Sequence, residues 1–452
     1  MTDSTGKFLA DRAESIRLVG WFRSAAPYIN LFKNKLFVTS VSKKNFSSGN
    51  LARLIQDLSF LRAIGVQIIL VFDPKDLLDE ELDRRKHSLI FEQGVPIIDD
   101  KAAECFKAAI GMMRIELESL FSTKLPNTSM NFSNIKIISG NFVDAKPIGI
   151  HKGVNFCKTG DLRKIDVSSI KRALDLDAIV LISPLGFSAT GELFFLNSEK
   201  LASDIASIMG ANKLIFITDS LNNSRKSFSE IRELLTKTYE ENKLSIIEKF
   251  PRLNYLFELA NSACNNNVDR THILPYEQDG EILLELFTRD GVGIMVSKNQ
   301  IRNIRPAVPA DINSILSLIY PFKNDGTLTK RDKVDIERNL SSYIVLDHDG
   351  QICGCACLNH YSEENVAEIS CLIVRPDYQQ KGEGSRLLKH VLEKAKRNNI
   401  KQIFALTTKA EHWFLEKGFI RGEKRVLPKE KSQTFEPSRN SLILIKSINY
   451  QN

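Results

Sequence analysis

The stretch RPDYQQKGEG, residues 375–384, carries two glycines at the junction of two patterns that predict regular structure. The residues before it, AEISCLIV (367–374), are mostly apolar and predict a strand. The residues after it, SRLLKHVLEKAK (385–396), repeat apolar side chains at helical spacing. Unpaired N–H groups at a helix start, together with the helix dipole, favour anions and above all phosphate. The stretch therefore predicts a phosphate-binding turn between strand and helix, although an ordinary loop is the simpler interpretation.

The residues on either side continue as short strands and helices. Two runs, SYIVLDHDG (342–350) and QICGCACLNHY (351–361), predict paired strands joined by a hairpin-like turn. Farther on, KQIFALTT (401–408) predicts a strand and HWFLEKG (412–418) a short aromatic helix. This order of elements, with its V-x-P and Q-x-x-G-x-G motifs, resembles the α+β fold of GCN5-related N-acetyltransferases over residues 303–447.

That resemblance implies a site for acetyl-CoA as co-substrate. In the family, the glycine turn holds the pyrophosphate, and a bulged strand before it presents backbone amides to the pantetheine and thioester. Glycines suit such a turn because no β-carbon keeps the backbone from the ligand. The implied cofactor-binding residues are Leu372, Ile373, Val374, Gln379, Gln380, Lys381, Gly382, Glu383 and Gly384.

The first two thirds of the chain alternate strand and helix patterns. VQIILVFD (66–73), DAIVLISP (177–184) and NKLIFITDS (212–220) predict short buried strands, with helical patterns between them. Such alternation favours an αβα sandwich around a largely parallel sheet. A polar boundary near residue 298 divides the chain into an N-terminal domain, 1–297, and a C-terminal domain, 298–452.

Composition narrows the function classes. The net charge of +7 is mild for 452 residues and comes without a nucleic-acid-binding motif, so no nucleic-acid partner is expected. No apolar run reaches the length of a membrane span or resembles a signal sequence, so we expect a cytoplasmic protein without a membrane partner. The seven cysteines include no C-x-x-C pair, and we expect no metal.

The resemblance extends over nearly the whole chain. The matching segments are AAPYI (25–29), SGNFVDAKPIG (139–149), SPLGFSATGELF (183–194), LLELFTRDGVG (283–293), LTTKAEHWFLEKGF (406–419) and SRNSLILIK (438–446). Together they resemble the bacterial N-acetylglutamate synthases, which fuse an amino-acid-kinase-like domain to an acetyltransferase domain. The resemblance implies acetyl transfer from acetyl-CoA to the α-amino group of L-glutamate, the first step of arginine biosynthesis. It also implies a homo-oligomer, which is a hexamer in that family.

Acetyl transfer to an amine requires a base, a donor for the thioester oxygen and an acid for the leaving thiolate. The resemblance assigns the base to Glu368, acting through water, and brings Cys371 into the site. A regular strand would put these two side chains on opposite faces, unless the family's bulge changes that. The leaving thiolate would take its proton from Thr407 or from water. The substrate carboxylates would bind at Lys330, Arg331, Arg439 and Ser441.

For the N-terminal domain the resemblance implies regulation by L-arginine. The implied arginine site consists of Tyr28, Lys213, His272, Glu285 and Gly293, with Glu285 paired to the guanidinium. The loops FVTSVSKKNFSSG (37–49) and LVFDPKD (70–76) lack the glycine pairs with which amino-acid kinases hold ATP, so we expect no kinase activity. Ile294 stands where the family commonly has threonine, which leaves open whether arginine regulation is retained.

Two other functions remain open at this point. The chain could be an arginine-sensing binding protein with a degenerate acetyltransferase domain. It could instead acetylate another amine, such as a protein lysine. The intact Q-x-x-G-x-G motif and Glu368 speak against the first, and the two arginines suited to a dicarboxylate speak against the second.

Overall fold

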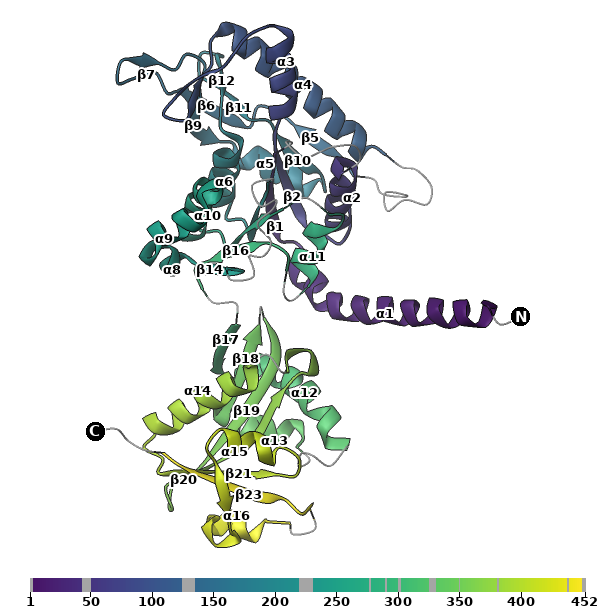
Figure 1. Ribbon diagram of the computed structural model, residues 1–452, viewed down its shortest axis with the longest axis vertical. Coiled ribbons are helices and arrows are strands. Elements are labelled where there is room, and N and C mark those ends of the chain that lie inside the picture. Colours follow the sequence, from purple (N-terminus) through teal and green to yellow (C-terminus); the bar gives the residue numbers. More distant parts are fainter. Residues whose placement is uncertain are drawn as a thin grey trace. The chain divides into compact units, whose positions relative to one another are not determined.

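The computed structural model describes residues 3–42, 50–123, 135–218, 231–275, 278–288, 291–299, 302–324, 331–348, 350–379, 382–436 and 439–448. The chain divides into two compact units, Met1–Asn299 and Gln300–Asn452 (Figure 1). The predicted boundary after residue 297 lies close to this division. Independent folding of the two pieces stays a prediction.

The N-terminal unit is built on an eight-stranded sheet. Its strands, in spatial order, are β14 (Glu233–Leu235), β16 (Ile294–Ser297), β15 (Arg270–Leu274), β13 (Lys213–Ile217), β1 (Leu36–Ser42), β2 (Gln67–Asp73), β10 (Ile179–Ile182) and β5 (Ile137–Ser139). Every neighbouring pair is parallel except β15–β16. Strands β2, β10 and β13 are mainly apolar runs, as expected where both faces of a sheet are covered.

Helices cover both faces of this sheet, so the predicted αβα sandwich is confirmed (Figure 1). One face packs against α5 (Val167–Asp175), α6 (Ser198–Met209) and α10 (Asn254–Asn265). The other packs against α1 (Asp3–Phe32), α2 (Asn50–Ala63), α4 (Asp100–Phe121) and α11 (Glu281–Phe287). Alternate residues of β2 pack on opposite faces of the sheet: Ile69 packs on the face covered by α5, α6 and α10, and Ile68 on the face covered by α1, α2, α4 and α11.

Smaller elements complete the unit. A four-stranded sheet has the order β12 (Leu193–Phe195), β11 (Leu185–Phe187), β6 (Val143–Pro147), β9 (Gly160–Ile165). The other elements in the described part of this unit are α3 (Lys75–Arg84), α8 (Thr236–Glu241), α9 (Lys243–Lys249), the 3-10 helix η1 (Pro251–Leu253) and two hairpins. The hairpins are β3 (Ile90–Glu92) with β4 (Val95–Ile97) and β7 (Ile150–His151) with β8 (Val154–Asn155).

The C-terminal unit contains a seven-stranded sheet. Its order is β17 (Arg302–Pro306), β18 (Tyr343–His348), β19 (Gln351–Tyr361), β20 (Val366–Val374), β21 (Gln402–Thr407), β23 (Leu442–Ser447), β22 (Ile420–Gly422). All neighbours are antiparallel except β20 and β21, which the helix between them makes parallel.

Helices pack on both faces of this second sheet. They are α12 (Ile312–Asn324), α13 (Lys333–Arg338), α14 (Glu383–Arg397), α15 (Glu411–Glu416) and α16 (Lys429–Gln433). The apolar stripe of α14, with Leu387 and Val391, covers Ala367 and Ile369 of β20. The helix α12 covers the other face through Ile315. The predicted hairpin, strand, helix and short aromatic helix are thus all present.

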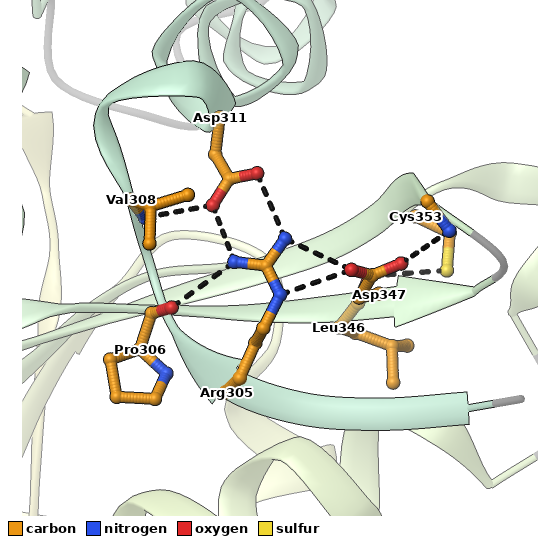
Figure 2. Close-up of polar contacts among 8 residues, drawn as sticks. Arg305, Pro306, Val308, Asp311, Leu346, Asp347 and Cys353 are labelled. Atoms are coloured by element: carbon orange, nitrogen blue, oxygen red, sulfur yellow. Dashed lines mark hydrogen bonds and ion pairs between the residues drawn. The ribbon is translucent and has the colours of Figure 1, made fainter. Parts of the chain in front are cut away.

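A network of charged side chains fastens the start of this unit to its sheet (Figure 2). Arg305 of β17 binds Asp311 with both terminal nitrogens, at 2.7 and 3.0 Å. Its Nε and Nη2 also donate to Asp347 of β18, at 3.0 and 2.9 Å. The Arg305 side chain is 28% exposed and those of Asp311 and Asp347 are 8% and 18% exposed, so water screens these pairs poorly.

We expect a fragment of residues 298–452 to fold by itself and to bind CoA. A fragment of residues 310–452 should be less stable by at least about 2–4 kcal/mol, because it lacks strand β17 and leaves the largely buried Asp311 and Asp347 without Arg305. Urea unfolding of the two fragments measures the difference, and a CoA-dependent thermal shift tests binding. An insoluble longer fragment, or equal stability of the two, would contradict this division.

Candidate active site

Strands β20 and β21 separate halfway along their length. They pair from Val366 opposite Gln402 to Ile369 opposite Ala405. Along its other edge β20 pairs with β19 over its whole length; the register of that pairing shifts after Ser370, and Cys371 has a left-handed φ of 50°. The strand therefore contains the bulge that the resemblance implies. Its second half lies at an opening between the two strands, where backbone groups can meet a ligand.

The bulge puts Cys371 on the same side of the sheet as Glu368. Ala367, Ile369 and then Leu372 pack on the side of α14, whereas Cys371 packs with α12. Glu368 alternates with Ala367 and Ile369 and so faces away from α14. The opposite-face arrangement expected for a regular strand is absent because one extra residue is inserted after Ser370.

Glu368 is held at both carboxylate oxygens. Lys431 of α16 places its Nζ 2.8 Å from Oε1, and the hydroxyl of Tyr361 donates to Oε2 at 3.3 Å. The side chain of Glu368 is only 5% exposed. Sequence reasoning missed both partners.

Arg331 lies directly at the bulge, although its sequence context suggests a surface charge. Its Nη1 donates to the hydroxyl of Tyr343 at 3.0 Å and to the thiol of Cys371, and its Nη2 donates to Ser370 Oγ at 3.0 Å. Burial raises the pKa of the Cys371 thiol, so this sulfur is neutral at pH 7. All three partners are uncharged, and no carboxylate pairs with Arg331 among the described residues. A guanidinium placed in this way is suited to an anionic ligand.

Asn359 of β19 extends this polar cluster. Its Nδ2 donates to Ser370 Oγ at 3.2 Å, and its Oδ1 accepts from the Cys357 thiol at 3.1 Å. Ser370 therefore receives hydrogen bonds from both Arg331 and Asn359, which fixes its hydroxyl at the bulge. Neither Ser370 nor Asn359 was predicted to belong to the site.

Thr407 ends β21 opposite Leu442 of β23. Its hydroxyl oxygen accepts from the backbone N–H groups of Ala410, at 2.9 Å, and Lys409, at 3.4 Å, so it also caps the turn into α15. The hydroxyl hydrogen is left to donate, as an acid would. Ser441 precedes Leu442 and so lies at the same end of the sheet, and the backbone N–H of Arg439 donates to Glu436. Lys330 lies outside the described residues.

The glycine turn starts α14 as predicted. Gly382 is the residue before the helix, and its φ of 80° is one that side-chain-bearing residues rarely adopt. The side chain of Gln379 donates to the carbonyl of Val374 at 2.8 Å, and Glu383 is buried and paired with Arg386 at 2.9 Å. These two side chains thus brace the turn through contacts within the protein. Gln380 and Lys381 lie outside the described residues.

Gly384 lies in the first turn of α14, close to an aromatic ring. A β-carbon there would stand 3.4 Å from Cζ2 of Trp413 in α15. This is an ordinary contact distance, so packing against α15 would tolerate a small side chain here, and the predicted role at the phosphate stays a prediction.

A groove of about 610 Å³ lies elsewhere in this unit. It runs between the second half of α14 and strands β22 and β23, with Lys389, Lys396, Ile420 and Lys446 along it. None of the predicted site residues that the structure describes lines it. The polar side chains described above gather instead at the β20 bulge.

In the N-terminal unit, three of the residues predicted to bind arginine form a continuous chain. Lys213 Nζ lies 3.1 Å from His272 Nε2, and His272 Nδ1 lies 2.6 Å from Glu285 Oε1. The other Glu285 oxygen accepts from the N–H groups of Val292, at 2.7 Å, and Gly293, at 2.9 Å. The predicted residues thus meet where β13 and β15 face α11 and the start of β16.

The charges along this chain are set by burial and hydrogen bonding. Burial, with help from Lys213, lowers the pKa of His272 to about 4, so the imidazole is neutral at pH 7. Burial opposes ionisation of Glu285, but hydrogen bonds from His272, Gly293 and Val292 outweigh it and lower its pKa to about 2. A neutral imidazole beside a carboxylate must donate from Nδ1, so its Nε2 accepts from Lys213.

Two further predicted residues border this chain. Tyr28 of α1 lies 6.1 Å, centre to centre, from the ring of Phe32, and the Lys213 ammonium stands 5.3 Å above that ring. At Gly293 a β-carbon would come within 2.5 Å of the carbonyl oxygen of Ile273, so only glycine fits there. Sequence reasoning missed Phe32 and the amide of Val292.

Family models match both units. The Amino acid kinase family model matches residues 38–240, and the Acetyltransferase (GNAT) family model matches residues 311–419. In the described residues, no helix has the length and apolarity that crossing a membrane demands.

Full-length relatives match the two units together. An amino-acid acetyltransferase of Ralstonia nicotianae is 40% identical over 96% of both chains, and one of Pasteurella multocida is 36% identical over 96% of this chain and 98% of its own. The crystal structure of N-acetylglutamate synthase from Neisseria gonorrhoeae, complexed with coenzyme A and L-arginine, superposes with a TM-score of 0.84. That protein is 30% identical, and the match covers 96% of this chain and 99% of the other. The chain therefore belongs to the amino-acid acetyltransferase family, as a bacterial-type N-acetylglutamate synthase in which an amino-acid-kinase fold precedes a GNAT fold.

Proposed function

We propose that the site at the β20 bulge transfers the acetyl group of acetyl-CoA to the α-amino group of L-glutamate. The observation that carries this proposal is Arg331, a guanidinium with three neutral partners at the bulge, two of which lie on the same strand as Glu368. Such a pair of groups suits a substrate that brings both a carboxylate and an ammonium. The Neisseria relative is also known in complex with coenzyme A and N-acetyl-glutamate.

Each chemical step then has a group to perform it. Glu368 takes a proton from the substrate ammonium, through a water molecule, and the free amine attacks the thioester carbon. Beyond the bulge, the backbone N–H groups of residues 371–374 that point away from β19 stabilise the negative charge on the thioester oxygen. The nitrogen loses its second proton to water as the C–S bond breaks, and the CoA thiolate takes a proton from Thr407, which regains one from water, or from water directly. One proton in all is released to the solvent. Neutral Cys371 takes part through its backbone.

Thiol release from acetyl-CoA tests the proposal directly. The assay is run with L-glutamate, other amino acids and a lysine peptide as acceptors. Release that depends on glutamate supports the proposal. Release with the peptide instead would assign the enzyme to another amine, and no release with any acceptor would leave an arginine-sensing protein as the better reading.

We further propose that the N-terminal unit binds L-arginine and lowers the activity. The support is the buried carboxylate of Glu285, which is ionised and held at the end of the chain from Lys213. The Neisseria synthase was crystallised with L-arginine. The loop 43–49, whose missing glycines speak against kinase activity, lies outside the described residues.

We expect Glu285→Gln to abolish the response to arginine. The glutamine keeps the shape but removes the charge that would pair with the guanidinium. Turnover and melting temperature are measured with and without millimolar arginine, and Glu258→Gln, a substitution of a half-exposed glutamate in α10, serves as the control. If arginine changes neither quantity in the unaltered protein, the site has lost its function.

A further inference from the structure

The contact between Lys431 and Glu368 joins two elements far apart in the sequence. The ammonium comes from α16, a five-residue helix with no buried residue, and the carboxylate comes from the centre of the sheet. The side chain of Lys431 is 21% exposed, against 5% for Glu368. An ionised carboxylate with so little water depends on its neighbours for stabilisation.

The segment that carries Lys431 is docked on the sheet beside Glu368. Leu427, just before α16, is buried in a cluster with Phe404 and Ile443. Phe404 is the residue of β21 that pairs with Glu368 across the parallel ladder. At the start of α16, the backbone N–H of Lys429 donates to Glu364 Oε1 at 3.1 Å. These contacts set the point from which Lys431 reaches the carboxylate.

We propose that Lys431 is a positioning residue for acetyl transfer, which keeps Glu368 ionised and aims its second oxygen at the substrate amine. This inference rests on the proposed role of Glu368 as the base. With Oε1 bound by Lys431, Oε2 is the oxygen that remains for the proton, and the weak contact from Tyr361 at 3.3 Å orients it. Lys431 thus acts through Glu368 and need not touch the substrate.

The other titratable groups near Glu368 do not supply this charge. Strand β19 contributes Tyr361 and Cys357, β20 contributes Cys371, and α16 adds Glu430. Burial raises the pKa values of the tyrosine and both thiols, that of Cys357 to about 12, so these groups are neutral at pH 7. Strand β21 contributes the apolar Phe404. The ammonium of Lys431 is the cation in contact with Glu368.

The test is the pH profile of kcat/KM for glutamate in the full-length enzyme. An opposite charge in contact changes the proton affinity of a carboxyl by about 10- to 1000-fold, so Lys431→Met should move the acid limb of the profile up by about 1–3 pH units. Activity should recover at higher pH, and the KM for acetyl-CoA should stay the same. Lys431→Arg, which keeps the charge, should restore most of the profile. Lys429→Met, at an exposed position of the same helix, is the matched control.

Measuring Lys431→Met in an enzyme that already carries Glu368→Gln separates the role of Lys431 from the assignment of Glu368 as the base. In Glu368→Gln enzyme, adding Lys431→Met should lower kcat by less than about twofold, because its effect passes through the carboxylate. One outcome is that Glu368→Gln lowers kcat while Lys431→Met leaves the acid limb of the pH profile in place. Lys431 is then only a surface contact: the inference about Lys431 is wrong, and the assignment of Glu368 as the base still holds. If Glu368→Gln itself has no effect, the base assignment fails. An equal loss at every pH together with a lower melting temperature would show a structural role and overturn the inference.

Discussion

Replacing Glu368 by glutamine should lower kcat for glutamate acetylation by roughly 10²–10⁴-fold at pH 7, the usual contribution of a positioned base. The amine of glutamate is almost entirely protonated at this pH and cannot attack until it loses a proton. Glutamine keeps the shape and can still accept from Tyr361, but its amide takes no proton. Both KM values should change little, because the substrate carboxylates and CoA bind elsewhere.

The pH dependence separates a base from a structural carboxylate. Raising the pH supplies free amine without help from the enzyme, so the deficit of Glu368→Gln should shrink towards pH 9. The matched control is Glu363→Gln, the same change at an exposed position just before β20. Activity of Glu368→Gln within about twofold of the unaltered enzyme at pH 7 would show that water suffices as the base, since a working base contributes far more.

Much of the C-terminal fold follows from local patterns in the sequence. The apolar stripe of α14 has helical spacing, and its residues do form one face of the core. Gly382 marks the start of the helix because its φ of 80° excludes most other residues. Such features depend on a few neighbouring residues, so a single sequence displays them.

The geometry of the site could not be predicted in the same way. Nothing in AEISCLIV shows that an extra residue is inserted after Ser370, because the bulge arises from pairing with β19. The partners of Glu368 lie on other elements, and Lys431 looks like one of many surface lysines. Arg331 is partly buried through its contacts with Tyr343 and the bulge, which lie on other elements. Contacts between distant segments leave no periodic signal in the chain.

In the N-terminal unit, too, the contacts within the site could not be predicted from local patterns in the sequence. Only the family resemblance singled out Lys213, His272 and Glu285, since their types and spacing carry no motif. Their proximity follows from the topology, because β13 and β15 are adjacent parallel strands and place Ile215 opposite His272. The neutral state of the imidazole could be stated only once its burial between a lysine and a carboxylate was known.

Replacing Arg331 by methionine should raise the KM for glutamate by about 30-fold to several thousand-fold, because losing a charge-assisted carboxylate contact costs roughly 2–5 kcal/mol. The KM for acetyl-CoA should hardly change, since the phosphates bind at the glycine turn. Arg439→Met should show the same pattern if it holds the second carboxylate, as the family resemblance implies. Arg338→Met, at an exposed position of α13, is the matched control for an effect of removed charge alone.

Arg331→Met should weaken glutamate binding without lowering the stability of the fold. This difference separates a substrate-binding role of Arg331 from a structural one. Arg331 lies against Tyr343 and Cys371, which pack with Ile315, Ile336 and other apolar side chains. A buried charge without a charged partner costs folding free energy, and a methionine of similar length fits such surroundings, so the melting temperature should stay level or rise. Arg331→Lys keeps the charge but loses the two-pronged donor geometry, and it should recover only part of the affinity. A lower melting temperature with an unchanged KM for glutamate would mean that Arg331 serves the packing of the bulge, and the carboxylate site would have to be sought elsewhere.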